Sequence, residues 1–305
     1  MPLFHCPIGA TLHGEPPCID CGLCYAQTKE EMVESTKKIR TYLKSPDRPR
    51  PNATRKIAVC GKGGAGKSTV TALLASVLQD EAFSILVMDT DDSNPGLFRL
   101  FGFDQEPKPL MKLLDRFSIG EEKPPAGWLE LDEITLQDIP PEFTLSHDGL
   151  KFLMVGKIED PFEGCACSMG DITRDFIDRL ILADKEMAVI DTEAGVESFG
   201  RGVERSVDTV LIVVEPTFES MALAEKINYM AEGIGVNKIN AILNKIPSGK
   251  IESATKTELL KKDVWPIGTI FLDQKITEDS FLGKPVGESQ AKEDMKKIVN
   301  RLLTE

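Results

Sequence analysis

Long apolar runs and an excess of positive charge are both lacking from this sequence of 305 residues. No apolar stretch approaches the ~20 residues that a membrane-spanning helix needs, and residues 1–10 lack a basic start followed by an apolar core. The formal net charge of -13 argues against a nucleic-acid partner, because nucleic-acid binders usually carry a basic face. We therefore expect a soluble, cytoplasmic protein that associates with neither nucleic acid nor membranes.

Cysteine is scarce, and its distribution excludes an ordinary secreted disulfide framework. Seven cysteines are an odd number, and all but one fall in two short clusters. In a reducing compartment such clusters indicate bound metal. Cys60 stands alone in an apolar run, where we expect a packed small residue. The clustered cysteines are Cys6, Cys18, Cys21, Cys24, Cys165 and Cys167.

Short, solid apolar runs separated by helix-length stretches predict an α/β fold. Such runs are typical of parallel strands that are buried on both faces. We expect a P-loop NTPase domain over 55–305, with a mostly parallel central sheet and helices on both faces. A cysteine-rich metal-binding segment over 1–27 and a helix with a proline-rich linker over 28–54 precede it. Residues 103–148 are proline-rich and acidic, which indicates an insertion or a surface excursion of unassigned role. The expected strands cover 57–60, 85–88, 152–155, 188–190, 210–214 and 239–243.

The strongest motif follows the first apolar run. Gly61, Gly66, Lys67 and Ser68 have the spacing of a phosphate-binding loop between an expected strand and an expected helix. The glycines let backbone N–H groups turn toward a phosphate, Lys67 reaches the β and γ phosphates, and the Ser68 hydroxyl ligates Mg²⁺. We therefore expect ATP and Mg²⁺ to bind here. The expected nucleotide-binding residues of the loop are Gly61, Lys62, Gly63, Gly64, Ala65, Gly66, Lys67, Ser68 and Thr69.

Lys62 narrows the class of nucleotide-binding protein. It directly follows the first glycine of the loop, from where it cannot easily fold back on the same nucleotide. The segment 62–68 resembles the signature of the MinD/ParA/nitrogenase-iron-protein class, whose members have a deviant Walker A loop. The resemblance implies that two copies sandwich two ATP molecules, with Lys62 and Lys67 as catalytic residues and Lys62 acting across the interface. The plain alternative is a solvated lysine on a loop.

Acidic residues at two expected strand ends complete the nucleotide site in this interpretation. The segment with Asp89 and Asp91 resembles the switch segment of the same class, which implies that Asp91 orients the attacking water and Asp89 lies near the magnesium. The run that ends at Asp191 has the form of a Walker B strand, with Asp191 completing the metal shell. Asn244 and Lys245 resemble the adenine-reading pair found after a late strand. The alternative is that these acidic residues form ordinary turns at strand ends. Their order and spacing behind the phosphate-binding loop favour the functional assignment.

Cys165 and Cys167 supply only half of a tetrahedral metal site. Two copies of the chain around a two-fold axis would supply four sulfurs. We therefore expect a metal ion at an interface between two ATP-bound copies. The alternative is a pair of small buried cysteines.

Three further segments together resemble the CooC family, which comprises accessory ATPases for nickel insertion into carbon monoxide dehydrogenase and includes a maturation factor of acetyl-CoA synthase. The segments are 164–167, 191–202 and 213–216. The resemblance implies an ATP-hydrolysing metallochaperone that dimerises with ATP and holds nickel or zinc at the Cys165/Cys167 pair. It delivers nickel to a client of the carbon monoxide dehydrogenase / acetyl-CoA synthase type. Ser198 departs from the pattern, because we expect histidine there in the close nickel-handling members.

The N-terminal cysteines lie outside the CooC pattern. Cys18, Cys21 and Cys24 have the spacing of iron–sulphur ligands, and Cys6 is a candidate fourth ligand, so a [4Fe-4S] cluster and zinc are both open. This segment favours an alternative function, an iron–sulphur carrier or scaffold ATPase of the Mrp type. A second alternative is a MinD-like membrane-associated regulator, because residues 295–303 carry an apolar helical stripe. A terminal helix packed on the sheet explains that stripe more simply.

Overall fold

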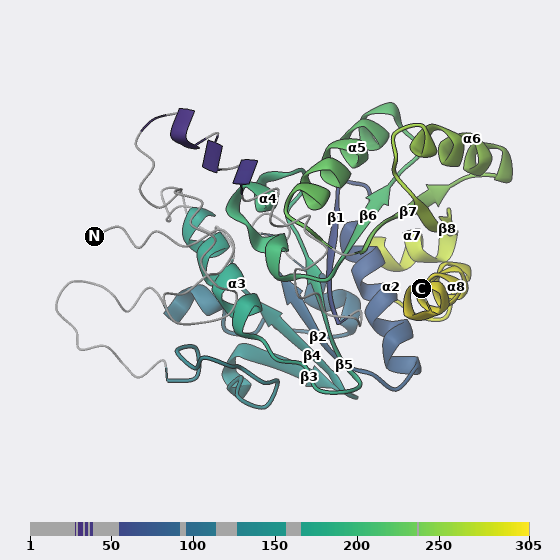
Figure 1. The fold of residues 1–305 in the computed structure, drawn as a ribbon. Coiled ribbons are helices and arrows are strands. Elements are labelled where there is room, and N and C mark those ends of the chain that lie inside the picture. The colour runs from purple at the N-terminus through teal and green to yellow at the C-terminus, as the bar shows by residue number, and fades with distance from the viewer. Residues whose placement is uncertain are drawn as a thin grey trace.

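The centre of the molecule is an eight-stranded sheet in the order β3-β4-β2-β5-β1-β6-β7-β8 (Figure 1). Every neighbouring pair is parallel except β3 and β4. The structure is a computed structural model that describes 28, 30–32, 34–35, 37–38, 55–91, 96–113, 127–156, 166–236 and 238–304, with backbone alone at 166–168 and 200–201. The strands are β1 (Lys56–Gly61), β2 (Ser84–Asp89), β3 (Thr144–His147), β4 (Leu150–Met154), β5 (Glu186–Asp191), β6 (Thr209–Val214), β7 (Lys238–Ile246) and β8 (Pro266–Phe271).

Helices cover both faces of the sheet. Successive strand residues point to opposite faces, so Ile57 and Val59 of β1 join one core while Ala58 and Cys60 join the other. The first core is shared with α2 (Lys67–Asp80), η2 (Leu97–Phe101) and α8 (Gln290–Thr304). The second core is shared with α3 (Ala166–Arg179), α4 (Glu197–Arg201), η6 (Val203–Ser206), α5 (Phe218–Gly233) and α6 (Gly249–Leu260). The predicted fold, a mostly parallel sheet between helical layers, is therefore confirmed.

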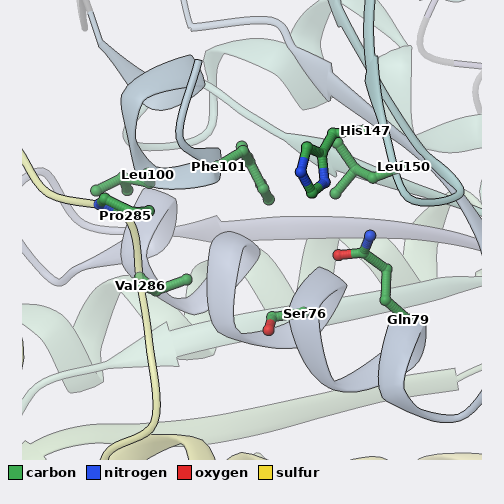
Figure 2. Close-up of a pocket in the computed structure, with 8 residues that line it drawn as sticks. All are labelled: Ser76, Gln79, Leu100, Phe101, His147, Leu150, Pro285 and Val286. Atoms are coloured by element: carbon green, nitrogen blue, oxygen red, sulfur yellow. The ribbon is translucent and has the colours of Figure 1, made fainter. Parts of the chain in front are cut away.

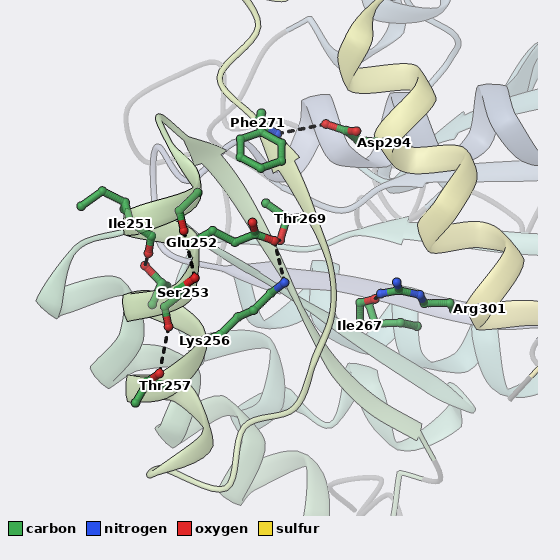
Figure 3. A network of polar contacts seen from close by, with 12 residues as sticks. Ile251, Glu252, Ser253, Lys256, Thr257, Ile267, Thr269, Phe271, Asp294 and Arg301 are labelled. Carbon is green, nitrogen blue, oxygen red and sulfur yellow. Dashed lines mark hydrogen bonds and ion pairs between the residues drawn. The ribbon is translucent and has the colours of Figure 1, made fainter.

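Two backbone groups of the edge strand β8 are hydrogen-bonded to side chains of α8 (Figure 3). The N–H of Phe271 donates to Asp294 of α8 at 3.3 Å, and Arg301 of α8 donates to the carbonyl of Ile267 at 2.6 Å. On the other side, the side-chain hydroxyl of Thr269 donates to the carboxylate of Glu252 of α6 at 2.8 Å. Capping an exposed edge in this way blocks pairing with another chain.

The C-terminal apolar stripe is part of the core. Met295, Ile298, Val299 and Leu302 of α8 are all buried in the core that α8 shares with α2. This confirms the simpler interpretation of the stripe, a terminal helix packed on the sheet. In the described ranges, no helix combines the length and the apolar character that crossing a membrane requires.

One expectation about organisation needs correction. Residues 103–148 are not only a surface excursion, because Ile134, Leu136, Ile139 and Phe143 are buried in the core and the stretch supplies η3 (Leu110–Leu113), η5 (Pro141–Phe143) and β3. The segment 1–27 lies outside the described residues. Part of 30–38 is helical, and Thr28 and Glu31 form a capping box at its start.

Candidate nucleotide and metal site

The predicted site residues gather because parallel strands deliver their carboxyl ends to one edge of the sheet. In the register of β1, β2 and β5, Val59 and Asp89 both pair with Asp191. On the other side of β1, Gly61 pairs with Val213 of β6. The phosphate-binding loop therefore leaves β1 between the acidic ends of β2 and β5 and the end of β6. Ligands of open parallel sheets bind in this position.

The loop needs its glycines for close approach of backbone to backbone. A Cβ on Gly61 would lie 2.6 Å from the carbonyl oxygen of Val213, and Gly61 has a φ of +149°. Gly66 has a φ of +94° and serves as the N-cap of α2. Because glycine offers no side chain to the first-turn N–H groups of α2, these groups and the positive end of the helix dipole suit a bound phosphate.

Asn244 and Lys245 contact the loop from β7. The amide of Asn244 donates to the carbonyl of Ala65 at 2.8 Å, and the ammonium of Lys245 donates to that of Gly64 at 2.5 Å. Both residues lie where the pairing of β7 with β8 shifts register, and Lys245 has a φ of +56°. Such an irregularity re-aims side chains at the end of a strand. Their adenine-reading role stays a prediction, and the structure adds that both residues brace the loop.

Asp191 is a fully buried carboxylate at the centre of the site. It accepts hydrogen bonds from Ser68 at 2.8 Å and from Thr71 at 3.2 Å. Burial, followed by the nearby charge of Asp89, raises the pKa of Asp191 to about 7. The folded chain therefore holds more negative charge here than its own hydrogen bonds and Lys67 offset. A divalent cation bound here would offset the free-energy cost of ionising the buried Asp191.

The donor set at this point fits Mg²⁺. The Ser68 hydroxyl and the carboxylates of Asp89 and Asp191 are oxygen donors, the ligands that Mg²⁺ prefers, and Mg²⁺ typically takes one or two carboxylates plus nucleotide phosphates. Asp89 and Asp91 are buried beside them, and the N–H of Asp91 donates to Asp89 at 3.2 Å. That bond fixes the backbone of the switch segment. The remaining residues of this segment, 92–95, lie outside the described residues.

Lys62 and Lys67 take different positions. Lys67 is buried at the start of α2, among the acidic residues. Lys62 lies at the surface of the loop and forms an ion pair of 3.0 Å with Glu215. The two lysines of the motif therefore do not share one target within a single chain.

Three polar contacts of the site were not predicted from the sequence. Thr71 follows Ser68 at helical spacing i, i+3, which places both hydroxyls on one face of α2, so this contact had a sequence signal. Thr90 donates its hydroxyl to the carbonyl of Asp191 at 2.8 Å and so joins β2 to the end of β5. Glu215 stood in a recognised motif without a role. Neither the Thr90 nor the Glu215 contact can be found without the strand register.

The described residues include little of the predicted cysteine sites. Cys6, Cys18, Cys21, Cys24 and Cys165 lie outside them, and of Cys167 the backbone alone is placed, in the first turn of α3. Within the described part of the chain, no group of three or more His, Cys, Asp or Glu side chains suited to a metal ion is found. Cys60 is buried as expected, and burial raises the pKa of its thiol well above the ordinary value.

A small pocket elsewhere on the molecule is separate from this site (Figure 2). Ser76 and Gln79 on its floor lie nine and twelve residues beyond Lys67 on α2, which at the rise of a helix is about 14 to 18 Å from the phosphate-binding end. The pocket therefore does not hold the phosphates. Its lining residues are Ser76, Gln79, Leu100, Phe101, His147, Leu150, Pro285 and Val286.

This fold with this loop defines a P-loop ATPase of the MinD/ParA class. The septum site-determining protein MinD of Pyrococcus horikoshii, solved with Mg-ADP, superimposes with a TM-score of 0.60 over 80% of this chain and 94% of that chain, at 19% identity. The ParA family model, described as NUBPL iron-transfer P-loop NTPase, matches residues 52–116.

Closer relatives resolve the family. An uncharacterised ATP-binding protein of Methanocaldococcus jannaschii is 42% identical over 63% of this chain and 78% of its own length. The carbon monoxide dehydrogenase accessory protein CooC of Rhodospirillum rubrum is 36% identical over 63% of this chain and 75% of its own length. The chain belongs to the CooC family of accessory ATPases.

Proposed function

We propose that this protein is an ATP-driven metallochaperone that handles nickel and delivers it to a client metalloenzyme in the cytoplasm. The observation that carries the proposal is the buried carboxyl group of Asp191 behind a signature-lysine loop. The chain is also 36% identical to a carbon monoxide dehydrogenase accessory protein. By that kinship, the client is an enzyme of the carbon monoxide dehydrogenase / acetyl-CoA synthase type.

The nucleotide step uses residues that already lie together. Lys67 and the loop N–H groups would hold the phosphates, and Ser68, Asp89 and Asp191 would hold Mg²⁺, which would supply charge neutralisation at the phosphates. Asp91 orients the water that displaces ADP from the γ-phosphorus, giving ADP and inorganic phosphate. In the proposal, Asn244 and Lys245 meet the adenine base beside the loop that they contact. Lys62 acts on the phosphates of a facing copy, so hydrolysis depends on a homodimer.

The cargo step is assigned to Cys165 and Cys167. Two copies would provide four thiolates, and closing the dimer around ATP would assemble the site while hydrolysis would open it. The site binds nickel in the proposal and zinc in its variant. The backbone of Cys167 lies in the first turn of α3. The positive end of a helix dipole favours a thiolate ligand in general, which supports the assignment.

Nickel stoichiometry of cysteine variants tests the cargo site. We expect Cys165→Ser or Cys167→Ser to abolish nickel binding while ATP binding survives, as measured by equilibrium dialysis and elemental analysis. Cys60→Ala is the matched control, because it removes one thiol that is buried in the sheet core and should keep the nickel. Wild-type nickel content in both the Cys165→Ser and the Cys167→Ser variant would refute the assignment.

The cross-subunit role of Lys62 has its own test. Lys62→Ala should retain nucleotide binding but lose the dependence of turnover on protein concentration, because the lysine contributes only when two copies meet. Phosphate release measured over a range of protein concentrations reports this. Wild-type behaviour in Lys62→Ala would remove the proposed role.

An iron–sulphur carrier of the Mrp type is the second candidate function. The NUBPL iron-transfer description of the matching family model and the spacing of Cys18, Cys21 and Cys24 favour it. Iron and sulfide analysis of anaerobically purified protein separates the two. A [4Fe-4S] cluster that transfers to an apo-acceptor, without nickel binding, would support the carrier function, whereas zinc alone would make 1–27 a structural clip.

A further inference from the structure

Lys62 and Glu215 form an ion pair inside one chain. The Nζ of Lys62 lies 3.0 Å from Oε1 of Glu215. The contact follows from the sheet, because Gly61 at the end of β1 pairs with Val213 of β6. Lys62 and Glu215 therefore follow the ends of two neighbouring strands. The pair is therefore built by the register of two central strands.

Glu215 is the fixed member of the pair. Its N–H donates to the Oγ of Ser220 at 3.2 Å, and its carbonyl oxygen accepts from the N–H of Thr217 at 2.7 Å. The Thr217 hydroxyl lies 3.5 Å from the same Oε1 that Lys62 contacts. Only 17% of the Glu215 side chain is exposed, against 37% for Lys62. Lys62 is therefore the group that can leave.

Glu215 competes with a phosphate of a facing copy for the ammonium of Lys62, because the ion pair directs that charge to a carboxylate of its own chain. We propose that Glu215 is an intramolecular latch, which holds Lys62 in the separate chain and releases it when two chains close around ATP. This inference rests on the cross-subunit role proposed above for Lys62. The latch makes the separate chain a poor dimerisation partner, so that closure requires the ATP phosphates to outcompete Glu215.

Each dimer requires two latches to open, so the effect on association is squared. A partly exposed ion pair shifts an equilibrium by about threefold, which gives about tenfold in a dimer dissociation constant. We expect Glu215→Gln to lower that constant by about tenfold, because glutamine keeps the volume and the oxygen acceptor but loses the charge. Turnover at saturating protein should stay within about twofold of wild type, since the assembled dimer still contains Lys62.

Sedimentation velocity of the full chain with Mg²⁺ and a non-hydrolysable ATP analogue measures the dimer constant. Steady-state phosphate release at rising protein concentration measures turnover. Glu219→Gln is the matched control, because Glu219 is exposed in the first turn of α5 and makes the same charge change. In a Lys62→Ala background, Glu215→Gln should have no further effect, because the latch has already lost its cation.

A dimer dissociation constant that is unchanged or higher in Glu215→Gln, with a wild-type melting temperature, overturns the latch. Lower turnover at saturating protein also overturns it and makes Glu215 a positioning residue for the closed state. A different result would contradict the proposed function: Lys62→Ala alone would keep wild-type dimerisation and turnover.

Discussion

Replacing Asp191 with asparagine should stabilise the metal-free protein while disabling its chemistry. The pKa of Asp191 is raised from 3.8 to about 7, so between these values the folded chain binds a proton that the unfolded chain has lost. Stability contributed by that proton is fully present below pH 3.8 and is lost as the pH rises through 7. A shift of this size corresponds to an upper bound of about 4 kcal/mol at 1.36 kcal/mol per unit.

Asparagine avoids the ionisation but keeps an oxygen acceptor for Ser68 or Thr71. We expect Asp191→Asn to exceed wild type in free energy of unfolding by about 2 to 4 kcal/mol at pH 8, and by little at pH 4. Urea unfolding in EDTA without nucleotide measures both values. The exposed Asp132→Asn is the control for removing one acid and should change neither.

The pH dependence of the difference decides the result. A gap between variant and wild type that is the same at pH 4 and pH 8, or a less stable variant at both, would contradict the reasoning. It would mean that the folded chain compensates the carboxylate without a cation. Loss of Mg²⁺-dependent phosphate release in the variant is expected in either case.

Two further predictions come from the loop and from the base of the sheet. Gly66→Ala places a Cβ 2.5 Å from Nδ2 of Asn244 at a φ of +94°, so we expect the free energy of unfolding in urea to fall by about 2 kcal/mol and ATP binding in titrations to weaken. Gly233→Ala is the control and should be neutral, because no atom lies within 4 Å of the added Cβ. Equal effects of the two substitutions would refute the steric account. Lys56 donates to the carbonyl of Ile177, and burial lowers the pKa of Lys56 to about 8. The free energy of unfolding should therefore rise by up to about 3 kcal/mol between pH 8 and 10.5. Lys56→Met should flatten that rise, and an unchanged slope in the variant would contradict the prediction.

The central strands could be predicted from sequence because they are buried on both faces. Each reads as a solid apolar run, as in β6, where every residue is buried. β8 was missed because it begins with proline, alternates in burial and lies at the edge. The core residues of 103–148, such as Ile134 and Phe143, are spaced too widely to give a period. Their burial is decided by the sheet that they cover.

The loop and its acids could be predicted because one short motif fixes their chemistry, and strand order fixes where the acids meet. The contacts that bind the loop to β6 and β7 could not. Glu215 meets Lys62, and Asn244 meets Ala65, across more than 150 residues of sequence. Only the register of three strands brings these pairs together, and a single sequence carries no signal of it.

Native mass spectrometry of the full chain tests the central claim most directly, because it counts chains, nucleotides and metal ions in one complex. With Mg²⁺, nickel and a non-hydrolysable ATP analogue, we expect a complex of two chains, two nucleotides and one nickel. With ADP we expect single chains without nickel. Nickel retained equally by single chains in both states, or a nucleotide-bound dimer that never takes up nickel, would contradict an ATP-switched metal carrier.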